Sequence, residues 1–305
     1  LEINLPEVFF DENGCLLEDG GFDVIIGNPP WEVWEADSDE FFSSVDTLYP
    51  MQGKKNEKVK RQRELFQQMP SIELRWNEYG ERYKKGSKFF ARKDDYQFQS
   101  GKINLYKIAV ERFIQLLKKG QHLSILVPDN LMTDFHSSKL RHLIFDECKL
   151  TEFLSFENRQ GIFKAVDGRY KFAVTTLTKD SISTDKPINS SFKAFFYKQD
   201  LSALHNESEK LNYPIKLVLA DAELYSLVEP RNKNEFELFQ KIRLSFPSLA
   251  ESRMLTLSND FNGTSDIEHI HPLIQGEVPV YEGKLMEQFV LRKKAERSVI
   301  EEEVI

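Results

Sequence analysis

The residues best suited to chemistry stand together in the stretch GGFDVIIGNPPWEVW, residues 20–34, where a short apolar run ends in Asn28, Pro29, Pro30 and Trp31. An asparagine side-chain oxygen and a main-chain carbonyl oxygen can together accept both N–H groups of an amine conjugated with an aromatic ring. The exocyclic amine of adenine is such a group and is a weak nucleophile. Accepting both protons bends the nitrogen toward tetrahedral geometry and aims its lone pair at an electrophile. The motif therefore predicts a site that activates an aromatic amine.

The prolines and the tryptophan suit the same task. Proline has no N–H group with which to draw neighbouring carbonyl oxygens into a β-ladder, so those oxygens stay available to a ligand. Trp31 offers a flat face, and stacking on an aromatic side chain contributes about 1–3 kcal/mol per base. The alternative is that Asn-Pro-Pro only turns the chain. The position favours chemistry, because open α/β sheets bind ligands at the carboxyl ends of their strands.

The composition is that of a globular protein with a large core. The chain has 305 residues, of which 40% are apolar and 30% charged. Two cysteines are too few for a disulfide framework or a cysteine zinc site, which indicates a reducing compartment. The first residues lack the basic start and apolar core of a signal peptide, and no apolar run reaches the roughly 20 residues of a membrane span. We expect a cytoplasmic protein with no membrane partner and no metal site.

The charge is unevenly distributed. The net charge is −8, yet residues 51–93 carry 13 Lys and Arg against five Glu, which is a local charge of +8. The field near a surface is set within a Debye length of about 8 Å, so such a patch can bind phosphates on an acidic protein. We expect DNA phosphate contacts at Lys54, Lys55, Lys60 and Arg61. The alternative is an ordinary solvated helix face.

The hydrophobic pattern predicts alternating strands and helices around this motif. Strands are expected at 22–27, 122–128, 150–157, 170–179 and 191–198, and helices at 104–120, 137–147 and 234–246. The expected helix 104–120 ends in Lys118, Lys119 and Gly120, a basic last turn with a glycine cap. Residues 32–100 are expected to form a polar and basic insertion with helices at 56–69 and 71–85. This order predicts an α/β fold with a mostly parallel sheet.

With the motif in its strand context, the chain resembles the amino DNA methyltransferases that modify adenine at its exocyclic nitrogen. GNPPW resembles their catalytic motif. KINLYKIAVERFIQLLKKGQHLSILVPDNLM, residues 102–132, resembles the helix and strand that follow it, and LTEFLSFENRQGIFKAVDGRYKFAVTTL, residues 150–177, resembles the segment that closes the base pocket. The stretches at 6–31 and 278–289 are similar to the branch associated with restriction systems. The resemblance is most convincing over residues 6–31 and 101–178.

The resemblance implies the carboxyl-terminal half of a Rossmann-like methyltransferase sheet with a C-terminal extension, divided into a catalytic part, 1–190, and an extension toward target recognition, 191–305. It implies methyl transfer from S-adenosylmethionine to an adenine flipped out of double-stranded DNA, and a nuclease domain or subunit as a further partner. Asn28 and Pro29 would accept the amine protons, within a catalytic motif that also includes Pro30, while Trp31 and Phe163 would enclose the base. Asn28, Leu105 and Tyr106 would lie at the cofactor.

The sequence departs from the family in one respect. The family binds its cofactor with a glycine-rich loop ahead of the catalytic strand, and no Gly-x-Gly occurs among the 27 residues before Asn28. We therefore expect this chain to be a piece of a longer protein and inactive by itself. Two alternatives stay open: a DNA-binding or scaffold piece without catalysis, and a methyltransferase acting on RNA or on a protein amide.

Overall fold

The computed structural model describes residues 2–179 and 190–247, together with short segments between residues 270 and 299. By its contacts the chain divides into two units, Leu1–Phe246 and Pro247–Ile305. In the second unit the described strands are β7 (His271–Pro272), β8 (Val278–Val280), β9 (Met286–Glu287), β10 (Val290–Leu291) and β11 (Arg297–Val299). Most of the expected extension toward target recognition beyond residue 247 lies outside the described residues.

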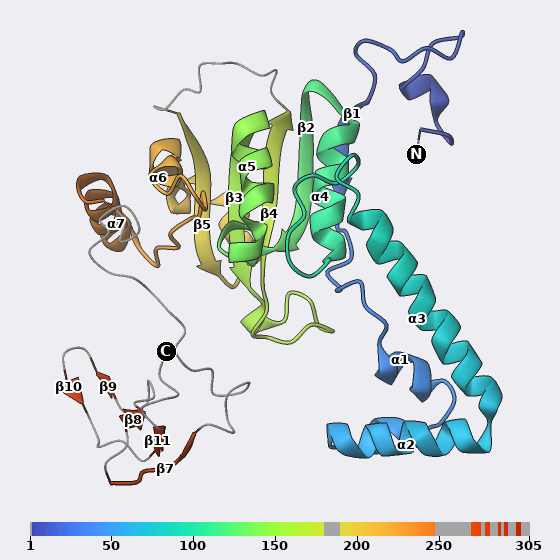
Figure 1. Cartoon of the computed structure of the whole chain (residues 1–305). Helices are drawn as coiled ribbons and strands as arrows, with labels where there is room; N and C mark the ends of the chain where they lie inside the picture. The colour runs from blue at the N-terminus through green and yellow to red at the C-terminus, as the bar shows by residue number, and fades with distance from the viewer. Residues whose placement is uncertain are drawn as a thin grey trace. The chain divides into compact units, whose positions relative to one another are not determined.

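The first unit is an α/β structure built on a six-stranded mixed sheet (Figure 1). Its strands are β1 (Phe22–Gly27), β2 (Leu117–Pro128), β3 (Cys148–Glu157), β4 (Lys171–Lys179), β5 (Ser191–Lys198) and β6 (Leu211–Pro214). They lie in the order β1-β2-β4-β3-β5-β6, with β1/β2 and β3/β5 parallel and the other three pairs antiparallel. The prediction of a mostly parallel sheet is therefore wrong. The reason is the short connection 158–170, which can join β3 to β4 only as antiparallel neighbours.

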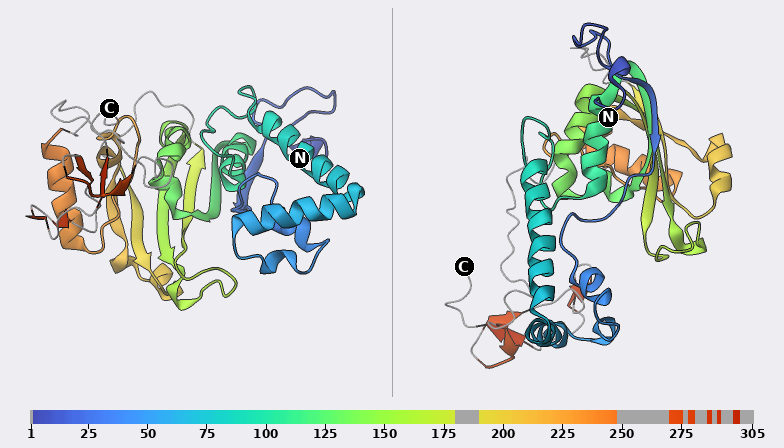
Figure 2. Two further views of the ribbon diagram at one scale, coloured as in Figure 1. Left: turned by 60° about the horizontal axis from the view of Figure 1, so that its bottom comes forward. Right: turned by 90° about the vertical axis from the view of Figure 1, so that its right-hand side faces the viewer.

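Helices α4 (Leu105–Leu116) and α5 (Ser138–Glu147) lie on one face of this sheet (Figures 1 and 2). Successive side chains of a strand point to opposite faces, and alternate residues of β2 enter the core beneath these helices. That core includes Val110 and Ile114 of α4, Leu143 of α5, and Leu123 and Ile125 of β2. The opposite face carries a second, aromatic cluster formed by Leu154, Phe156, Phe172, Phe195 and Ala203.

The carboxyl end of α4 differs from the prediction. The helix stops at Leu116, and Lys118, Lys119 and Gly120 belong to β2 instead of forming the end of the helix. Leu117 already pairs with Phe22 of β1. Gly21, at φ +138°, lies so close that a Cβ there would come within 2.7 Å of the Leu116 carbonyl oxygen. This pairing between distant segments overrides the local helical pattern. The other strands and helices named above from the sequence are confirmed within a few residues.

The domain boundary expected at residue 190 falls between two strands of one sheet. β5 pairs with β3, and β6 pairs with β5. Helices α6 (Ile215–Leu219) and α7 (Lys233–Ser245) follow within the same unit, which runs to Phe246. The structural framework of the site therefore extends past residue 190.

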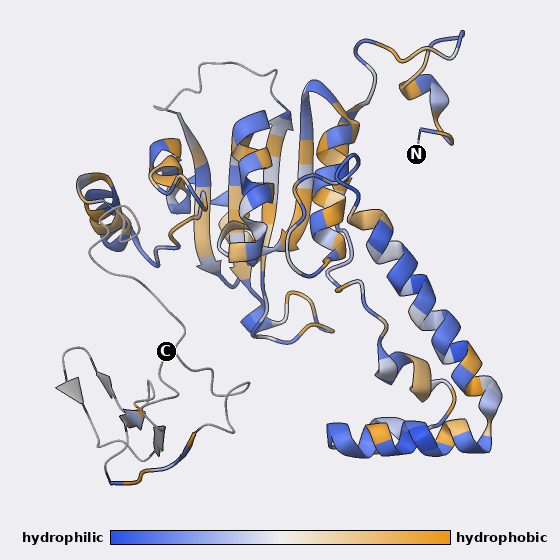
Figure 3. Cartoon of the chain, viewed as in Figure 1, coloured by the Kyte–Doolittle hydropathy of each residue, from blue (hydrophilic) through white to orange (hydrophobic). Residues whose placement is uncertain are grey.

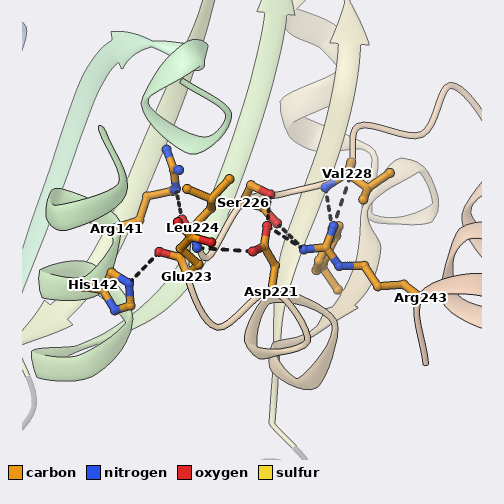
Figure 4. Close-up of polar contacts among 9 residues, drawn as sticks. Arg141, His142, Asp221, Glu223, Leu224, Ser226, Val228 and Arg243 are labelled. Carbon is orange, nitrogen blue, oxygen red and sulfur yellow. Dashed lines mark hydrogen bonds and ion pairs between the residues drawn. The ribbon is translucent and has the colours of Figure 1, made fainter. Parts of the chain in front are cut away.

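The segment between β6 and α7 is fastened to α5 (Figure 4). The buried Arg141 donates from Nε to the carbonyl oxygen of Leu224, at 2.7 Å, and His142 contacts the carbonyl oxygen of Glu223, at 3.1 Å. Arg243 of α7 pairs with Asp221, at 3.2 Å. These contacts fix a segment whose last acidic residue, Glu229, reaches the site described below.

The insertion forms a helical arm of α1 (Ser38–Ser43), α2 (Lys55–Gln68) and α3 (Pro70–Phe90). Figure 3 shows α2 and α3 as largely hydrophilic helices, and a small aromatic core of Phe41, Phe42, Tyr49, Leu65 and Ile72 holds the arm together. Trp34 anchors α3 to the strand exit, because its Nε1 donates to the Tyr83 carbonyl oxygen at 3.0 Å. Gly86 makes room for this indole, since a Cβ there would lie 2.5 Å from Nε1.

Candidate active site at the carboxyl end of β1

Asn28 directly follows β1, at the carboxyl end of the parallel pair β1/β2, where Gly27 pairs with Ile125. Its side chain is exposed and makes no hydrogen bond with any residue that the structure describes, whereas Pro29 is buried and Pro30 exposed. Burial of Pro29 fixes the course of the chain while the adjacent amide stays free. The Asn28 side chain is thus available as an acceptor for a ligand.

The chain after Trp31 runs alongside the start of α4. The main-chain carbonyl oxygen of Glu32 accepts from the N–H of Leu105 at 2.9 Å. The main-chain N–H of Trp34 donates to the carbonyl oxygen of Ile103 at 2.8 Å. Of the two residues expected at the cofactor, Leu105 is half-buried, while Tyr106 is buried and its hydroxyl donates to Asn130 at 3.2 Å. Burial raises the pKa of Tyr106 well above its ordinary value, so the phenol stays protonated. These contacts bring the start of α4 next to the motif.

Trp31 stands at the end of a row of aromatic rings on the sheet. Its ring is stacked on Phe172 with centroids 6.3 Å apart, and Phe172 is stacked on Phe156 at 5.5 Å. The register produces this row, because Phe172 of β4 pairs with both Pro128 of β2 and Phe156 of β3. The Trp31 ring is thereby held against the buried Phe172, which itself stacks on the buried Phe156.

Phe163 lies beside Trp31, as expected from the sequence, although the two rings are not parallel. Their centroids are 6.3 Å apart at an interplanar angle of 81°, and Phe163 also contacts Phe172 edge-on at 4.9 Å. A base held between Trp31 and Phe163 would require one ring to turn. Enclosure of a base by this pair stays a prediction.

A cavity of about 840 Å³ opens beside Trp31. This volume lies within the range of about 300–1,000 Å³ usual for ligand sites. Its wall combines the end of β2, the start of α4 and the start of β4, and consists of Trp31, Lys102, Asn104, Tyr106, Lys107, Pro128, Asp129, Asn130, Asp134, His136, Arg169, Tyr170 and Lys171. Asn28, Leu105 and Phe163 are not part of this wall.

Three ion pairs, made by two lysines, stiffen the cavity wall. The Nζ of Lys107 lies 2.8 Å from Asp134, and that of Lys171 lies 2.7 Å from both Asp129 and Glu229. Burial, opposed by the lysine, raises the pKa of Asp129. Burial would also raise the pKa of Asp134, but Lys107 outweighs it and holds that pKa below its usual value.

Sequence reasoning missed most of this wall. Asp129 and Asn130 follow β2 as Asn28 follows β1, and the carboxyl ends of these parallel strands meet at one edge. That rule could have identified both residues. Nothing local marks Lys107 or Glu229, which reach the site through the packing of α4 and of the segment before α7.

The four basic residues expected to contact phosphates lie at the start of α2 and along it. Lys54, Lys55 and Lys60 are exposed. Arg61 is engaged within the arm, where it pairs with Asp46 at 2.7 Å and with Glu64 at 3.2 Å. The three lysines are free to meet a phosphate, whereas Arg61 serves the arm.

For the S-adenosylmethionine expected from the sequence, this unit provides residues on one side of a site only. The uncommitted Asn28 amide and the cavity at Trp31 fit the end of the cofactor from which a group is transferred. In the described part of the chain ahead of Asn28, no glycine-rich turn follows a strand, so the rest of the cofactor has no main-chain cradle there.

Among the described residues, no three His, Cys, Asp or Glu side chains are grouped to hold a metal ion. None of the helices described is long and apolar enough to cross a membrane.

Comparison with known families gives one match. Residues 78–163 match the Eco57I restriction-modification methylase model. The matched range begins within α3, includes α4, β2, α5 and β3, and ends at Phe163. It leaves Asn28 and Trp31 outside. The chain matches no curated protein.

Solved structures share parts of the fold at low identity. A protein from Listeria monocytogenes assigned to the class I S-adenosylmethionine-dependent methyltransferases is 15% identical over 41% of this chain and 34% of its own, with a TM-score of 0.27. A chain of a type I restriction-modification complex is 9% identical over 76% and 41%, with a TM-score of 0.40. The M protein of the type I enzyme EcoKI is 12% identical over 56% and 48%, with a TM-score of 0.33. The chain thus spans less than half the length of each.

Proposed function

We propose that this chain is part of a site-specific DNA methyltransferase of a restriction-modification or related defence system, which transfers a methyl group to the exocyclic nitrogen of an adenine. The observation that carries the proposal is the free amide of Asn28 at the carboxyl end of β1, next to Trp31 and its cavity. The match of residues 78–163 to a restriction-modification methylase family supports the class of enzyme.

The geometry supports activation of an aromatic amine. The Asn28 side-chain oxygen and the Pro29 carbonyl oxygen would accept the two amine protons and leave the lone pair directed at the incoming methyl group. The base would lie with one face on Trp31, whose ring borders the cavity and is held by Phe172. Extrusion of the base from the duplex gives up its stacking there, and the Trp31 ring would offset part of that cost.

S-adenosylmethionine would supply the methyl group on a positively charged sulfur. The residues of this chain proposed to lie near it are Asn28, Leu105 and Tyr106. Asn28 and Pro29 would hold the amine so that its lone pair meets this electrophilic methyl group, and the surplus amine proton would leave to water. Asn28 needs only to accept a hydrogen bond throughout, so no side chain has to act as a base.

Double-stranded DNA is the proposed substrate, and a nuclease in the same system is a proposed partner. A cytoplasmic location belongs to the same proposal and is supported by the low cysteine content, two in 305 residues, which is too few for a disulfide framework. The division into a catalytic part, 1–190, and an extension, 191–305, is kept as a functional proposal.

The decisive experiment is Asn28→Ala in the complete protein. Loss of one such acceptor should lower the methylation rate about 100-fold or more, with folding and DNA affinity little changed. Asn206→Ala, which alters an exposed helix cap, is the matched control. Labelled methyl groups should appear in N6-methyladenine when the DNA is digested to nucleosides. Retention of more than about a tenth of the rate, or label in cytosine, would overturn the assignment.

A further inference from the structure

Asn158 directly follows β3 and opens the connection to β4 that contains Phe163. It is only 1% exposed, although it begins an otherwise largely surface-lying loop. A buried amide has to satisfy its own hydrogen-bonding groups, since leaving them unpaired is costly. The partners of its side chain therefore show what it holds in place.

The side chain of Asn158 binds the main chain of Phe163 at both ends. Its Oδ1 accepts from the Phe163 N–H at 2.8 Å, and its Nδ2 donates to the Phe163 carbonyl oxygen at 2.9 Å. The second hydrogen on Nδ2 goes to the carbonyl oxygen of Val166, at 2.7 Å. An asparagine amide has two donor hydrogens, and both are used on the segment 163–166.

The remaining contacts of the loop fasten its ends more than its middle. Asn158 donates from its own main chain to Tyr170 at 2.9 Å, and Gly161 turns the chain at φ +69°. Lys164 and Ala165 are exposed. The Asn158 side chain is the buried group that fixes the main chain at Phe163.

We infer that Asn158 is a positioning residue that holds Phe163 against Trp31 and presents its ring to an extruded base. This inference rests on the proposed function. Because both main-chain groups of Phe163 are held, the start of its side chain is fixed, while the ring can still turn about its own bonds. The Phe163 ring now meets Trp31 edge to face, so it has to turn before a base can enter between the two rings. The free rotation of its side chain allows this turn.

The first test reads the loop itself and needs no activity. Trypsin can cut after Arg159, Lys164 and Arg169. In Asn158→Ala, cleavage after Lys164 should be at least about tenfold faster than in the wild type, because cleavage follows the population of the opened loop and removal of each hydrogen bond can shift it severalfold. Leu177→Ala, which removes a buried side chain far along β4, is the control for general destabilisation. If Asn158→Ala does not fold, Asn158→Asp keeps the shape and the acceptor but removes both donors.

The second test links Asn158 to Phe163 in the complete protein. Asn158→Ala and Phe163→Ala should reduce to a similar extent the extruded-base signal of DNA with 2-aminopurine at the target position and the methylation rate of the matching DNA with adenine there. The double variant should be no worse than Phe163→Ala. Wild-type cleavage after Lys164, unchanged methylation in Asn158→Ala, or a double variant far below Phe163→Ala would each overturn the inference. A wild-type protein that methylates no DNA would instead overturn the proposed function.

Discussion

Phe163 and Phe172 are neighbours in space with different surroundings, and this separates their expected roles. Phe172 is 2% exposed and lies between Trp31 and Phe156 in the aromatic row, whereas Phe163 is half-buried on a loop. We expect Phe172→Ala to lower the free energy of unfolding by about 3–5 kcal/mol, as for other buried phenylalanines. Phe163→Ala should cost less stability and should mainly weaken retention of the extruded base.

Urea unfolding and 2-aminopurine fluorescence measure the two effects separately in the complete protein. If Phe163→Ala leaves both the fluorescence and the methylation rate at wild-type levels, Phe163 does not hold the base. The competing interpretation, that Phe163 is only part of the core, would then stand.

The pair Lys107–Asp134 gives a residue-scale prediction with a defined pH dependence. The folded state lowers the pKa of Asp134, so its contribution to stability is complete above the unfolded pKa of about 3.9 and is lost as the pH falls through the lower folded pKa. Lys107→Met keeps the apolar stem and removes the charge. We expect a loss of roughly 1–3 kcal/mol at pH 7, because a half-buried carboxylate is left without its cation.

Urea unfolding at pH 7, 5 and 3.5 would check this. The difference from wild type should be constant between pH 7 and 5 and smaller at pH 3.5. Lys102→Met is the control, since Lys102 and its partner Glu35 are 75% and 59% exposed. An equal difference at all three pH values would mean that the ion pair does not contribute.

At the scale of elements, the arm α1–α3 divides its basic residues between two tasks. Arg61 pairs with Asp46, which is 8% exposed, so it stabilises the arm. Lys54, Lys55 and Lys60 are exposed, and we expect their combined reversal to Glu to weaken DNA binding and flatten its salt dependence. Each phosphate that these lysines no longer neutralise should reduce the slope of log K against log salt by about 0.9.

The matched control reverses Lys216, Lys233 and Lys241, which are equally exposed on α6 and α7. Affinity measured between about 50 and 200 mM salt distinguishes the sets, because neutralisation of phosphates dominates that dependence. An equal change of slope in both would assign the effect to net charge. If the slope of log K against log salt is unchanged in the arm variant, the lysines of α2 form an ordinary solvated face.

The elements show how far sequence alone could go. Phe22–Gly27 was predictable because an apolar run bounded by glycine and proline fixes a strand locally. The end of α4 was not predictable, because Leu116 and Leu117 suit either the end of a helix or the start of a strand. Only the pairing of Leu117 with the distant Phe22 decides where the helix ends. The prediction of a mostly parallel sheet was wrong for the same reason, because strand direction also depends on pairing between distant segments. In the site, the motif Asn28–Trp31 was visible as a continuous stretch, whereas Lys107, Asp134 and Glu229 converge from three segments.

At the scale of the whole molecule, the site depends on parts that lie far apart in the sequence. Asn28 directly follows β1, most of the cavity wall comes from the segment around the start of α4 and the segment that follows β2, and the segment before α7 supplies Glu229 to Lys171. Arg141 of α5 fastens that last segment to α5 through the main-chain carbonyl oxygen of Leu224. A truncation that removes residues after 190 should therefore disturb the cavity as well as the extension.

The cofactor gives the prediction for the molecule as a whole. In the described sheet β1 pairs only with β2, and Val24 and Ile26 on β1 are 56% and 80% exposed. Asn28 is free, but ahead of it the described residues offer no glycine-rich turn whose N–H groups could meet the ligand. We expect the isolated chain, residues 1–305, to bind S-adenosylmethionine more weakly than micromolar, and the complete protein to bind it more tightly. Titration calorimetry of both, with S-adenosylhomocysteine as a second ligand, measures the difference. Micromolar affinity in the isolated chain would mean that Asn28, Leu105, Tyr106 and their neighbours suffice, and that the cofactor site lies within this unit.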